Sequence, residues 1–203
     1  MHHVYAEQLR RHAVDLIWLG YGRLNSRSLA SADEDDITGE LVREMKSVAQ
    51  DPSSPDWVDR YEVHEQIQQN VHGKRGKHRP RMDIEIECHR RGPRPRLGFE
   101  AKRLGRGTSV GGYLGQEGLG AFLDGHYPTT HGDAGMLGYI QDKTRAHWSK
   151  QIANGLSSDL ARFRIVANEN WETTLNSAPC CCTSHNSANG KPLFVIHVLL
   201  AFT

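Results

Sequence analysis

The sequence predicts an α/β fold in which helices flank a central mixed β-sheet. Apolar residues recur at helical spacing in the first fifty residues, alternate with charged residues between 82 and 104, and then fall into segments that favour helix and strand in turn. A chain with this order needs a sheet with antiparallel and parallel neighbours, covered by its helices. We expect residues 1–203 to form a single domain, with N-terminal helices in 1–50 and the sheet core with its flanking helices in 58–203.

Two helices are expected before the sheet. The first spans residues 6–24, where one helical face carries Leu9, Ala13, Leu16 and Ile17. An acidic connector, "SRSLASADEDD", leads to a second helix at 37–49, whose apolar stripe is formed by Ile37, Leu41, Met45 and Val48. Asp36 is the expected N-cap of this second helix, and the two prolines of "QDPSSPD" follow its end.

Three strands are expected next. Helix and strand compete over Tyr61–Val71, and we favour a strand there. The segment "MDIEIECH", which begins at Met82, alternates apolar and polar residues as a strand with two different faces does. The segment "LGFEAKRL", residues 97–104, alternates in the same way, and the turn "RRGPRPR" between the two makes them a hairpin.

The remaining chain alternates between helix and strand. We expect a helix at 113–124, a buried strand at 134–142, a helix at 144–156 and a buried closing strand at 193–202. The intervening "SAPCCCTSHNSANGKP" is expected to be a loop. His197 lies within the closing strand, and we interpret it as a core histidine that hydrogen-bonds the backbone rather than as a catalytic residue.

The composition indicates a cytoplasmic protein with no membrane partner. No apolar run reaches the length of a transmembrane helix, and acidic residues interrupt the apolar patch near the N-terminus. Three of the four cysteines are consecutive, at 180–182, which is unsuited to a disulfide framework. Cys180, Cys182 and His185 offer an alternative, a small zinc-stabilised interaction protein, although their spacing matches no common zinc pattern. We favour thiols in a loop.

Positive charge is concentrated in one segment of the chain. Residues 72–106 hold twelve Lys or Arg and four Asp or Glu, a net charge of +8, while the whole chain carries only +1. Such a segment suits a polyanion, because each neutralised phosphate releases counterions, although a solvated surface cluster is the alternative. The loops 72–81 and 90–96 are therefore expected to bind the nucleic-acid backbone. The candidate contacts are Lys74, Arg75, Lys77, Arg79, Arg81 and Arg106.

The predicted hairpin brings acids and a lysine together. With a turn centred near Gly92–Pro93, Asp83 lies opposite Lys102 or its neighbour, and Glu100 lies about 7–8 Å away on the same face. Paired carboxylates at this spacing hold a hard cation such as Mg²⁺, which lowers the pKa of a bound water and polarises a phosphoryl oxygen. A neighbouring lysine can orient that water and offset the charge that develops. A solvated, charged face of the sheet is the alternative.

These residues resemble the PD-(D/E)xK nuclease superfamily, which has the restriction-endonuclease-like fold. Asp83, after "RPRM" and before "IEI", corresponds to the first acid, and Glu100, Ala101 and Lys102 correspond to the Glu-x-Lys element. The resemblance implies a core of helix, three strands, helix and strand. It also implies a divalent Mg²⁺ or Mn²⁺ bound by Asp83, Glu100 and the Ala101 backbone carbonyl, and a water assisted by Lys102. Met82 stands where the superfamily label has proline, a position at which members vary.

Other residues are weaker candidates for the same site. Members of the superfamily often use an acid from the helix before the sheet, for which we favour Glu40 over Glu44. Glu85 can replace Asp83 as a metal ligand if the hairpin register slips by two residues. Gln116 can reach the site from the helix that follows the Glu-x-Lys strand.

The sequence therefore predicts a metal-dependent nuclease that hydrolyses DNA with a metal-activated water, in restriction or phage defence. RNA is not excluded as a substrate, and a homodimer fits a reaction that cuts both strands of a duplex. The alternative within the same fold is a protein that binds nucleic acid without cleaving it.

Overall fold

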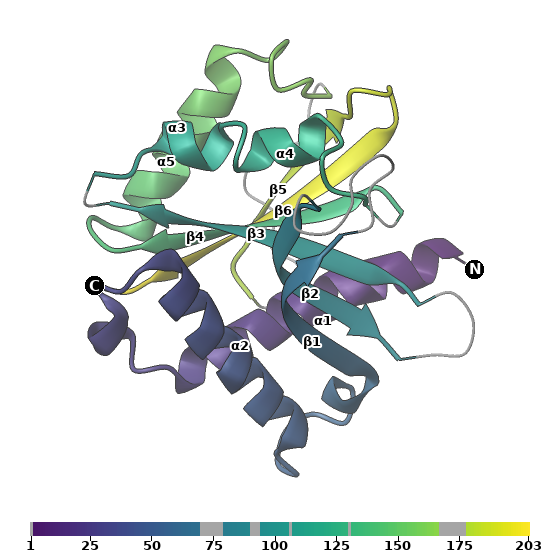
Figure 1. Ribbon diagram of the computed structural model, residues 1–203, viewed down its shortest axis with the longest axis vertical. Coiled ribbons are helices and arrows are strands. Elements are labelled where there is room, and N and C mark those ends of the chain that lie inside the picture. Colours follow the sequence, from purple (N-terminus) through teal and green to yellow (C-terminus); the bar gives the residue numbers. More distant parts are fainter. Residues whose placement is uncertain (1, 70–78, 90–93, 106, 130, 167–177) are drawn as a thin grey trace.

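The chain folds around a six-stranded mixed β-sheet with helices on both of its faces (Figure 1). The computed structural model describes residues 2–69, 79–89, 94–105, 107–129, 131–166 and 178–203. Its strands are β1 (Tyr61–Gln68), β2 (Arg81–Cys88), β3 (Arg96–Leu104), β4 (Asp133–Ile140), β5 (Cys181–Asn186) and β6 (Pro192–Ala201). The predicted class, α/β with a central mixed sheet flanked by helices, is confirmed.

The order of the strands across the sheet is β1-β2-β3-β4-β6-β5. The first three strands form an antiparallel meander, whereas β3, β4 and β6 pair in parallel, and β5 lies antiparallel to β6 at the far edge. All eight residues of β4 are buried, as expected for a central parallel strand whose two faces are both covered. The segment at 61–71, in which helix and strand compete, is a strand as far as Gln68.

Helices cover the sheet in two groups. α1 (His2–Arg23) and α2 (Glu34–Gln50) lie on one face, and α3 (Val110–Leu114), α4 (Leu119–Leu123) and α5 (Arg145–Ser158) lie on the other (Figure 1). Short 3₁₀ segments at Ser26–Leu29 and Val58–Arg60 connect α1 to α2 and α2 to β1. Each face has its own apolar core, which we call the first core and the second core in that order. Within the described residues, no helix combines the length and apolar composition needed to cross a membrane.

The start of α2 differs from the prediction. The helix begins at Glu34, with Asp33 rather than Asp36 at the N-cap position, so the acidic connector supplies its first turn. Glu34, Asp35 and Asp36 all lie in that turn, where carboxylates interact favourably with the positive end of the helix dipole. The apolar stripe alone could not locate this start, because its first member, Ile37, lies three residues inside the helix.

The single helix predicted at 113–124 is two short helices, α3 and α4. The chain bends between them at Gly115–Gly118, where the backbone passes very close to the preceding turn. A Cβ atom on Gly118 would lie 2.2 Å from the carbonyl oxygen of Tyr113, so only glycine permits this approach. The periodicity of the apolar residues predicts a helix here, but it contains no information about a backbone contact of this kind.

The predicted loop at 177–192 contains a strand, β5. Its residues, "CCTSHN", are mostly polar or small, and Thr183 is the one β-branched residue among them, so the segment has little of the side-chain pattern that marks a strand. They form a strand because β6 offers an unpaired edge, to which Cys181–Asn186 bind in antiparallel register. The prediction was wrong because this pairing depends on a neighbour and not on the segment's own pattern.

A chain of buried polar side chains surrounds His197, and we call it the histidine network. The ring of His197 bonds the Tyr113 hydroxyl (3.0 Å) and the Thr183 hydroxyl (2.8 Å), and Thr183 also bonds His185 (2.7 Å). His185 bonds the backbone carbonyl of Phe163 at 2.7 Å. Burial, with His185 nearby, lowers the pKa of His197 to about 3, so its ring is neutral. His197 is a core histidine as predicted, but these partners are side-chain hydroxyls.

Candidate active site

The hairpin of β2 and β3 loses its regular pairing at Asp83. The paired residues run from Glu87–Arg96 to Ile84–Phe99, a register that brings Asp83 level with Glu100, whereas the sequence prediction set it opposite Lys102 or a neighbour. Beyond this point the backbone N–H of Ala101 donates its hydrogen bond to a side chain, the Oδ2 atom of Asp83, at 2.7 Å. In a regular hairpin the acceptor would be a backbone carbonyl of the neighbouring strand. The Asp83 carboxylate is therefore fixed against β3.

The backbone around Asp83 is irregular on β2 itself and on the neighbouring strand β1. Met82 packs in the second core and Ile84 in the first, although residues two apart in a regular strand share a face. Across the ladder on β1, Gln66 has a positive φ of 48°. Non-glycine residues in this region cluster at functional sites, because their strain is retained where a side chain must be aimed. The distortion directs Asp83 toward the residues described next.

Glu100 is held in the interior by two partners. Its side chain is only 7% exposed, its Oε1 accepts from the Lys102 ammonium at 2.9 Å, and its Oε2 accepts from the Tyr127 hydroxyl at 2.9 Å. Glu100 and Lys102 are two apart on β3 and lie on the same face of the strand, as the alternation predicts. The structure therefore brings Asp83, Glu100 and Lys102 together at one place on the sheet.

The acid contributed by α2 is Glu34. Its Oε1 lies 3.0 Å from the Lys102 ammonium, and its Oε2 accepts from the backbone N–H of Arg103 at 2.9 Å. Glu40, the candidate favoured from the sequence, instead pairs with Arg43 on the outer side of α2 and is not brought to this cluster. The earlier start of α2 explains the difference, because it puts Glu34 in a helical turn beside β3. We call Asp83, Glu100, Lys102 and Glu34 the carboxylate cluster.

The charges of the carboxylate cluster are poorly balanced. Burial raises the pKa of Glu100 to about 7, with repulsion from Asp83 adding to the effect and the Lys102 ammonium opposing it. Burial also raises the pKa of Asp83, against the stabilising Ala101 N–H and Lys102. Burial alone would lower the pKa of Lys102, but Glu100 and Glu34 outweigh it and raise the pKa. Near neutral pH the lysine is therefore charged, while Glu100 is only partly ionised.

A divalent cation would relieve this repulsion, and the oxygen donors suit one. Asp83 and Glu100 offer carboxylates, and the Ala101 carbonyl faces the same edge of β3 as its N–H, which bonds Asp83. Within the described ranges, no group of three or more His, Cys, Asp and Glu side chains is arranged to hold a metal ion. Two carboxylates are nevertheless enough for Mg²⁺, which keeps several waters and shares its remaining positions with substrate phosphate.

The structure does not bring the other candidate acid and the candidate amide into the cluster. Glu85 is buried, accepts from the Gln69 amide at 3.0 Å and lies 3.5 Å from the Arg96 guanidinium. Gln116 is exposed between α3 and α4, where it lines a separate hollow with Arg162 and Arg164. Neither residue hydrogen-bonds to Asp83. The hairpin register places Asp83, and not Glu85, beside Glu100.

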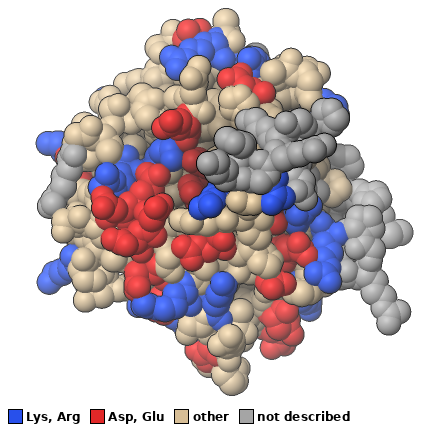
Figure 2. Space-filling view, viewed as in Figure 1, with Lys and Arg blue, Asp and Glu red and all other residues tan. Residues whose placement is uncertain are grey.

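The described basic residues of the 72–106 segment are largely neutralised by acids. Arg94 pairs with Glu87, Arg96 with Glu85, and Arg103 with Asp33. Arg79 donates to Gln68, and Arg81 is exposed at the start of β2. Figure 2 shows acidic side chains gathered over the start of α2, next to basic ones. Four of the predicted nucleic-acid contacts lie outside the described residues: Lys74, Arg75, Lys77 and Arg106.

The three candidate zinc ligands do not converge. Cys180 and Cys182 lie in the first core, beside α1. His185 points to the opposite side of β5, where both of its ring nitrogens are hydrogen-bonded, one to Phe163 and one to Thr183. None of the four cysteines forms a disulfide. The alternative of a small zinc-stabilised protein therefore has no support in this geometry.

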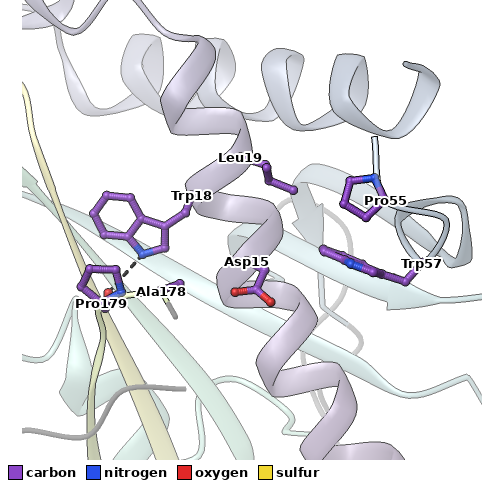
Figure 3. A pocket seen from close by; sticks show the side chains of 7 residues that line it. All are labelled: Asp15, Trp18, Leu19, Pro55, Trp57, Ala178 and Pro179. Carbon is purple, nitrogen blue, oxygen red and sulfur yellow. Dashed lines mark hydrogen bonds between the residues drawn. The ribbon is translucent and has the colours of Figure 1, made fainter. Parts of the chain in front are cut away.

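Two tryptophans far apart in the sequence line a hollow of about 430 Å³ beside α1 (Figure 3). Asp15 lies between Trp18 and Trp57, and the Trp18 indole N–H donates to the Pro179 carbonyl at 3.1 Å. Trp57 stacks on His12 with ring centroids 4.3 Å apart. Both indoles thus pack α1 against its neighbours, and no member of the carboxylate cluster lines this hollow.

Comparisons with known proteins give no identification. No protein-family model matches the chain, and searches of curated proteins and of solved structures found no match. The fold alone defines an α/β protein with a mixed sheet, an architecture that hosts many unrelated functions. The residues of the carboxylate cluster therefore have to carry the functional inference.

Proposed function

We propose that the protein is a metal-dependent nuclease that hydrolyses DNA phosphodiester bonds at the carboxylate cluster. The observation that carries this proposal is a buried acid, Glu100, beside a half-buried acid, Asp83, and a lysine ammonium that lies 2.9 Å from Glu100. Strongly perturbed carboxyls with a specific charge partner are typical of functional sites. A solvated charged face of the sheet would not bury Glu100.

Asp83, Glu100 and the Ala101 carbonyl are the proposed ligands of Mg²⁺ or Mn²⁺. Hard, oxygen-only donors of this kind fit these ions better than zinc, which takes nitrogen and sulfur ligands readily. Such a cation, when bound, would lower the pKa of a water and polarise the phosphoryl oxygen. Asp83 remains fixed by the Ala101 N–H at 2.7 Å, so the chain presents one carboxylate in a defined position before any ion arrives.

Lys102 is proposed to act as a cation and hydrogen-bond donor rather than as a base. Glu100 and Glu34 hold its ammonium at 2.9 Å and 3.0 Å and raise its pKa, so it stays protonated near neutral pH. A protonated lysine can orient the attacking water and offset negative charge on the phosphorane-like transition state. Glu34 is a positioning residue in this scheme, because it acts through Lys102 and the Arg103 backbone.

The order of elements supports the same proposal. The chain runs from α2 through β1, β2 and β3 to the α3 and α4 helices and then β4. The resemblance to the PD-(D/E)xK superfamily implies this order of helix, three strands, helix and strand, with the acid on the second strand and Glu-x-Lys on the third. We propose a restriction-endonuclease-like core on this basis. A homodimer that cuts both strands, and a role in restriction or phage defence in the cytoplasm, extend the proposal.

A cleavage assay tests the proposal directly. Purified protein is incubated with supercoiled plasmid, linear DNA and RNA in Mg²⁺, in Mn²⁺ and in EDTA. We expect the wild type to cut DNA only with a divalent ion, and Asp83→Ala and Lys102→Ala to lose cleavage. Glu40→Gln is the matched control, because Glu40 pairs with Arg43 away from the cluster and should leave cleavage unchanged.

Two outcomes would contradict parts of the proposal. Equal cutting by wild type, Asp83→Ala and Lys102→Ala would remove the site assignment. Salt-sensitive DNA binding with no cleavage in either metal would favour the alternative of a binding protein that lacks catalysis. Cleavage confined to RNA would keep the site and change the substrate.

A further inference from the structure

A hollow of about 630 Å³ adjoins the carboxylate cluster. One wall comes from the segment between α4 and β4, and the other from the turn that joins β5 to β6. The volume lies within the range of sites that hold small molecules. Residues that matter for its chemistry are Phe122, Tyr127, Pro128, His131, Lys191 and Leu193.

Tyr127 links the hollow to the cluster. Its ring lines the hollow, while its hydroxyl donates to Glu100 Oε2 at 2.9 Å. A ligand resting on this ring therefore sits next to the residue that bonds a proposed metal carboxylate. The hollow can therefore receive a group attached to a phosphate at the cluster.

The two walls of the hollow are tied together. The N–H of Phe194 donates to the Gly132 carbonyl at 2.7 Å, at the foot of both walls. Gly132 has a φ of +75°, and a Cβ atom there would lie 2.6 Å from the Pro192 carbonyl oxygen. Glycine alone allows this approach. The close backbone contact therefore holds the two walls of the hollow at a fixed distance from each other.

The lining matches the chemistry of a nucleotide. The ring of Tyr127 packs against buried Phe122, with centroids 5.2 Å apart, and together with Leu193 they make an apolar wall. At the rim, Lys191 and His131 are exposed and polar. Nucleobases stack on aromatic rings, and phosphates bind cationic side chains, which are the two features that single-strand binding sites combine.

We propose that this hollow is a subsite for one unpaired nucleotide beside the scissile phosphate, so that DNA that is single-stranded or frayed at the cut site is preferred over intact duplex. The proposal rests on the nuclease function proposed above. A base can enter a walled hollow only after it leaves the stack, which costs least when the strand is already unpaired. Lys191 would bind the adjoining phosphate, and the apolar wall with Tyr127 would bind the base.

Binding in EDTA tests this subsite apart from cleavage. A labelled 12-nucleotide strand and the duplex of the same sequence are titrated with wild type, Lys191→Ala and Thr129→Trp, the last of which fills the hollow from its exposed edge. We expect the single strand to bind at least tenfold more tightly than the duplex, and each variant to lose about fivefold or more in single-strand affinity. The control is Lys150→Ala, at an exposed lysine on α5 outside the hollow, which should bind as wild type does.

The results separate this proposal from the proposed nuclease function. Equal affinity for strand and duplex, or unchanged affinity in both Lys191→Ala and Thr129→Trp, would overturn the subsite whether or not the protein cleaves DNA. Loss of the single-strand preference in the two variants would support it. Failure of every DNA to be cut in Mg²⁺ or Mn²⁺ would instead count against the nuclease function, because the binding assay contains no metal.

Discussion

Two groups of polar side chains, the histidine network and the carboxylate cluster, differ in how well their hydrogen bonds and charges are balanced. In the histidine network, His197 is neutral and each ring nitrogen has a hydroxyl partner within 3.0 Å. In the carboxylate cluster, burial raises the pKa of both Asp83 and Glu100, and repulsion from Asp83 raises the pKa of Glu100 further. The first group is held by hydrogen bonds of a neutral ring, whereas the second keeps like charges close together.

This difference separates a structural polar group from the one that we propose to be functional. Buried hydrogen-bonding groups ordinarily find partners, and a complete network ties β5, β6 and α3 together without further need. A buried and a half-buried acid near one lysine keep an unfavourable interaction that simple packing would not require. The cation site that we propose would explain why such an arrangement persists. Substitutions in the two groups should therefore differ in whether they change stability or catalysis.

The largest expected effect is on catalysis, from Asp83→Asn. The amide oxygen can still accept from the Ala101 N–H, so the fold is retained while a carboxylate charge is lost. We expect the rate of Mg²⁺-dependent DNA cleavage to fall about 100- to 1000-fold, the size of effect seen when one electrostatic catalytic group is removed. Thermal unfolding in EDTA should show no loss of stability, because one repelling charge has gone. A marked drop in stability would mean that Asp83 is a structural residue.

The opposite pattern is expected from His197→Ala. The change leaves a cavity, removes the partner of the Tyr113 hydroxyl and removes one of the two partners of the Thr183 hydroxyl, so the free energy of unfolding should fall by about 3 kcal/mol. Urea denaturation of the metal-free protein measures it, with exposed His126→Ala as the control. Cleavage per folded molecule should not change. A selective loss of cleavage at full stability would contradict the structural assignment.

Metal affinity should depend on pH through Glu100. Its pKa of about 7, against an ordinary value of 4.5, means that the folded metal-free protein holds a proton there that the unfolded chain releases. The cation must displace this proton, so apparent Mg²⁺ affinity should rise about tenfold per pH unit up to pH 7 and then level off. For the same reason, the stability of the metal-free protein should fall as pH rises from about 4.5 to about 7.

Calorimetric titration of Mg²⁺ between pH 5.5 and 8.5 would measure the pH dependence, and denaturation in EDTA over the same range would measure the stability. Glu100→Gln should bind the ion weakly, and neither its Mg²⁺ affinity nor its stability should change with pH as in the wild type. A flat affinity profile in the wild type would show that Glu100 does not exchange a proton for the metal.

The smallest effect is expected from Glu34→Gln, because Glu34 acts only through Lys102 and Arg103. Its amide oxygen can still accept from the Arg103 N–H, but the charge that holds the Lys102 ammonium is lost. We expect kcat/KM for DNA cleavage to fall about tenfold, or about 1.4 kcal/mol in the barrier. Glu40→Gln on the same helix should change it less than twofold. Equal effects of the two changes would remove Glu34 from the cluster.

Local patterns in the sequence were sufficient for part of the candidate site. Alternation with period 2 puts Glu100 and Lys102 on one face of β3, and the turn between 90 and 96 makes β2 its antiparallel neighbour, so Asp83 comes close to both. These properties depend on residues within a single hairpin. The same is true of the apolar stripes of α1 and α2, whose predicted members are buried in the first core.

Only the tertiary structure decided which other residues join the cluster. Glu34 is 68 residues from Lys102, and Tyr127 is 27 from Glu100, so no repeating pattern connects them. Their positions depend on where α2 starts, how α3 and α4 bend at Gly118, and how both cores pack against the sheet. β5 exists for the same reason, since β6 supplies its partner. Periodicity describes the few residues of one element, whereas these contacts arise from the packing of several elements at once.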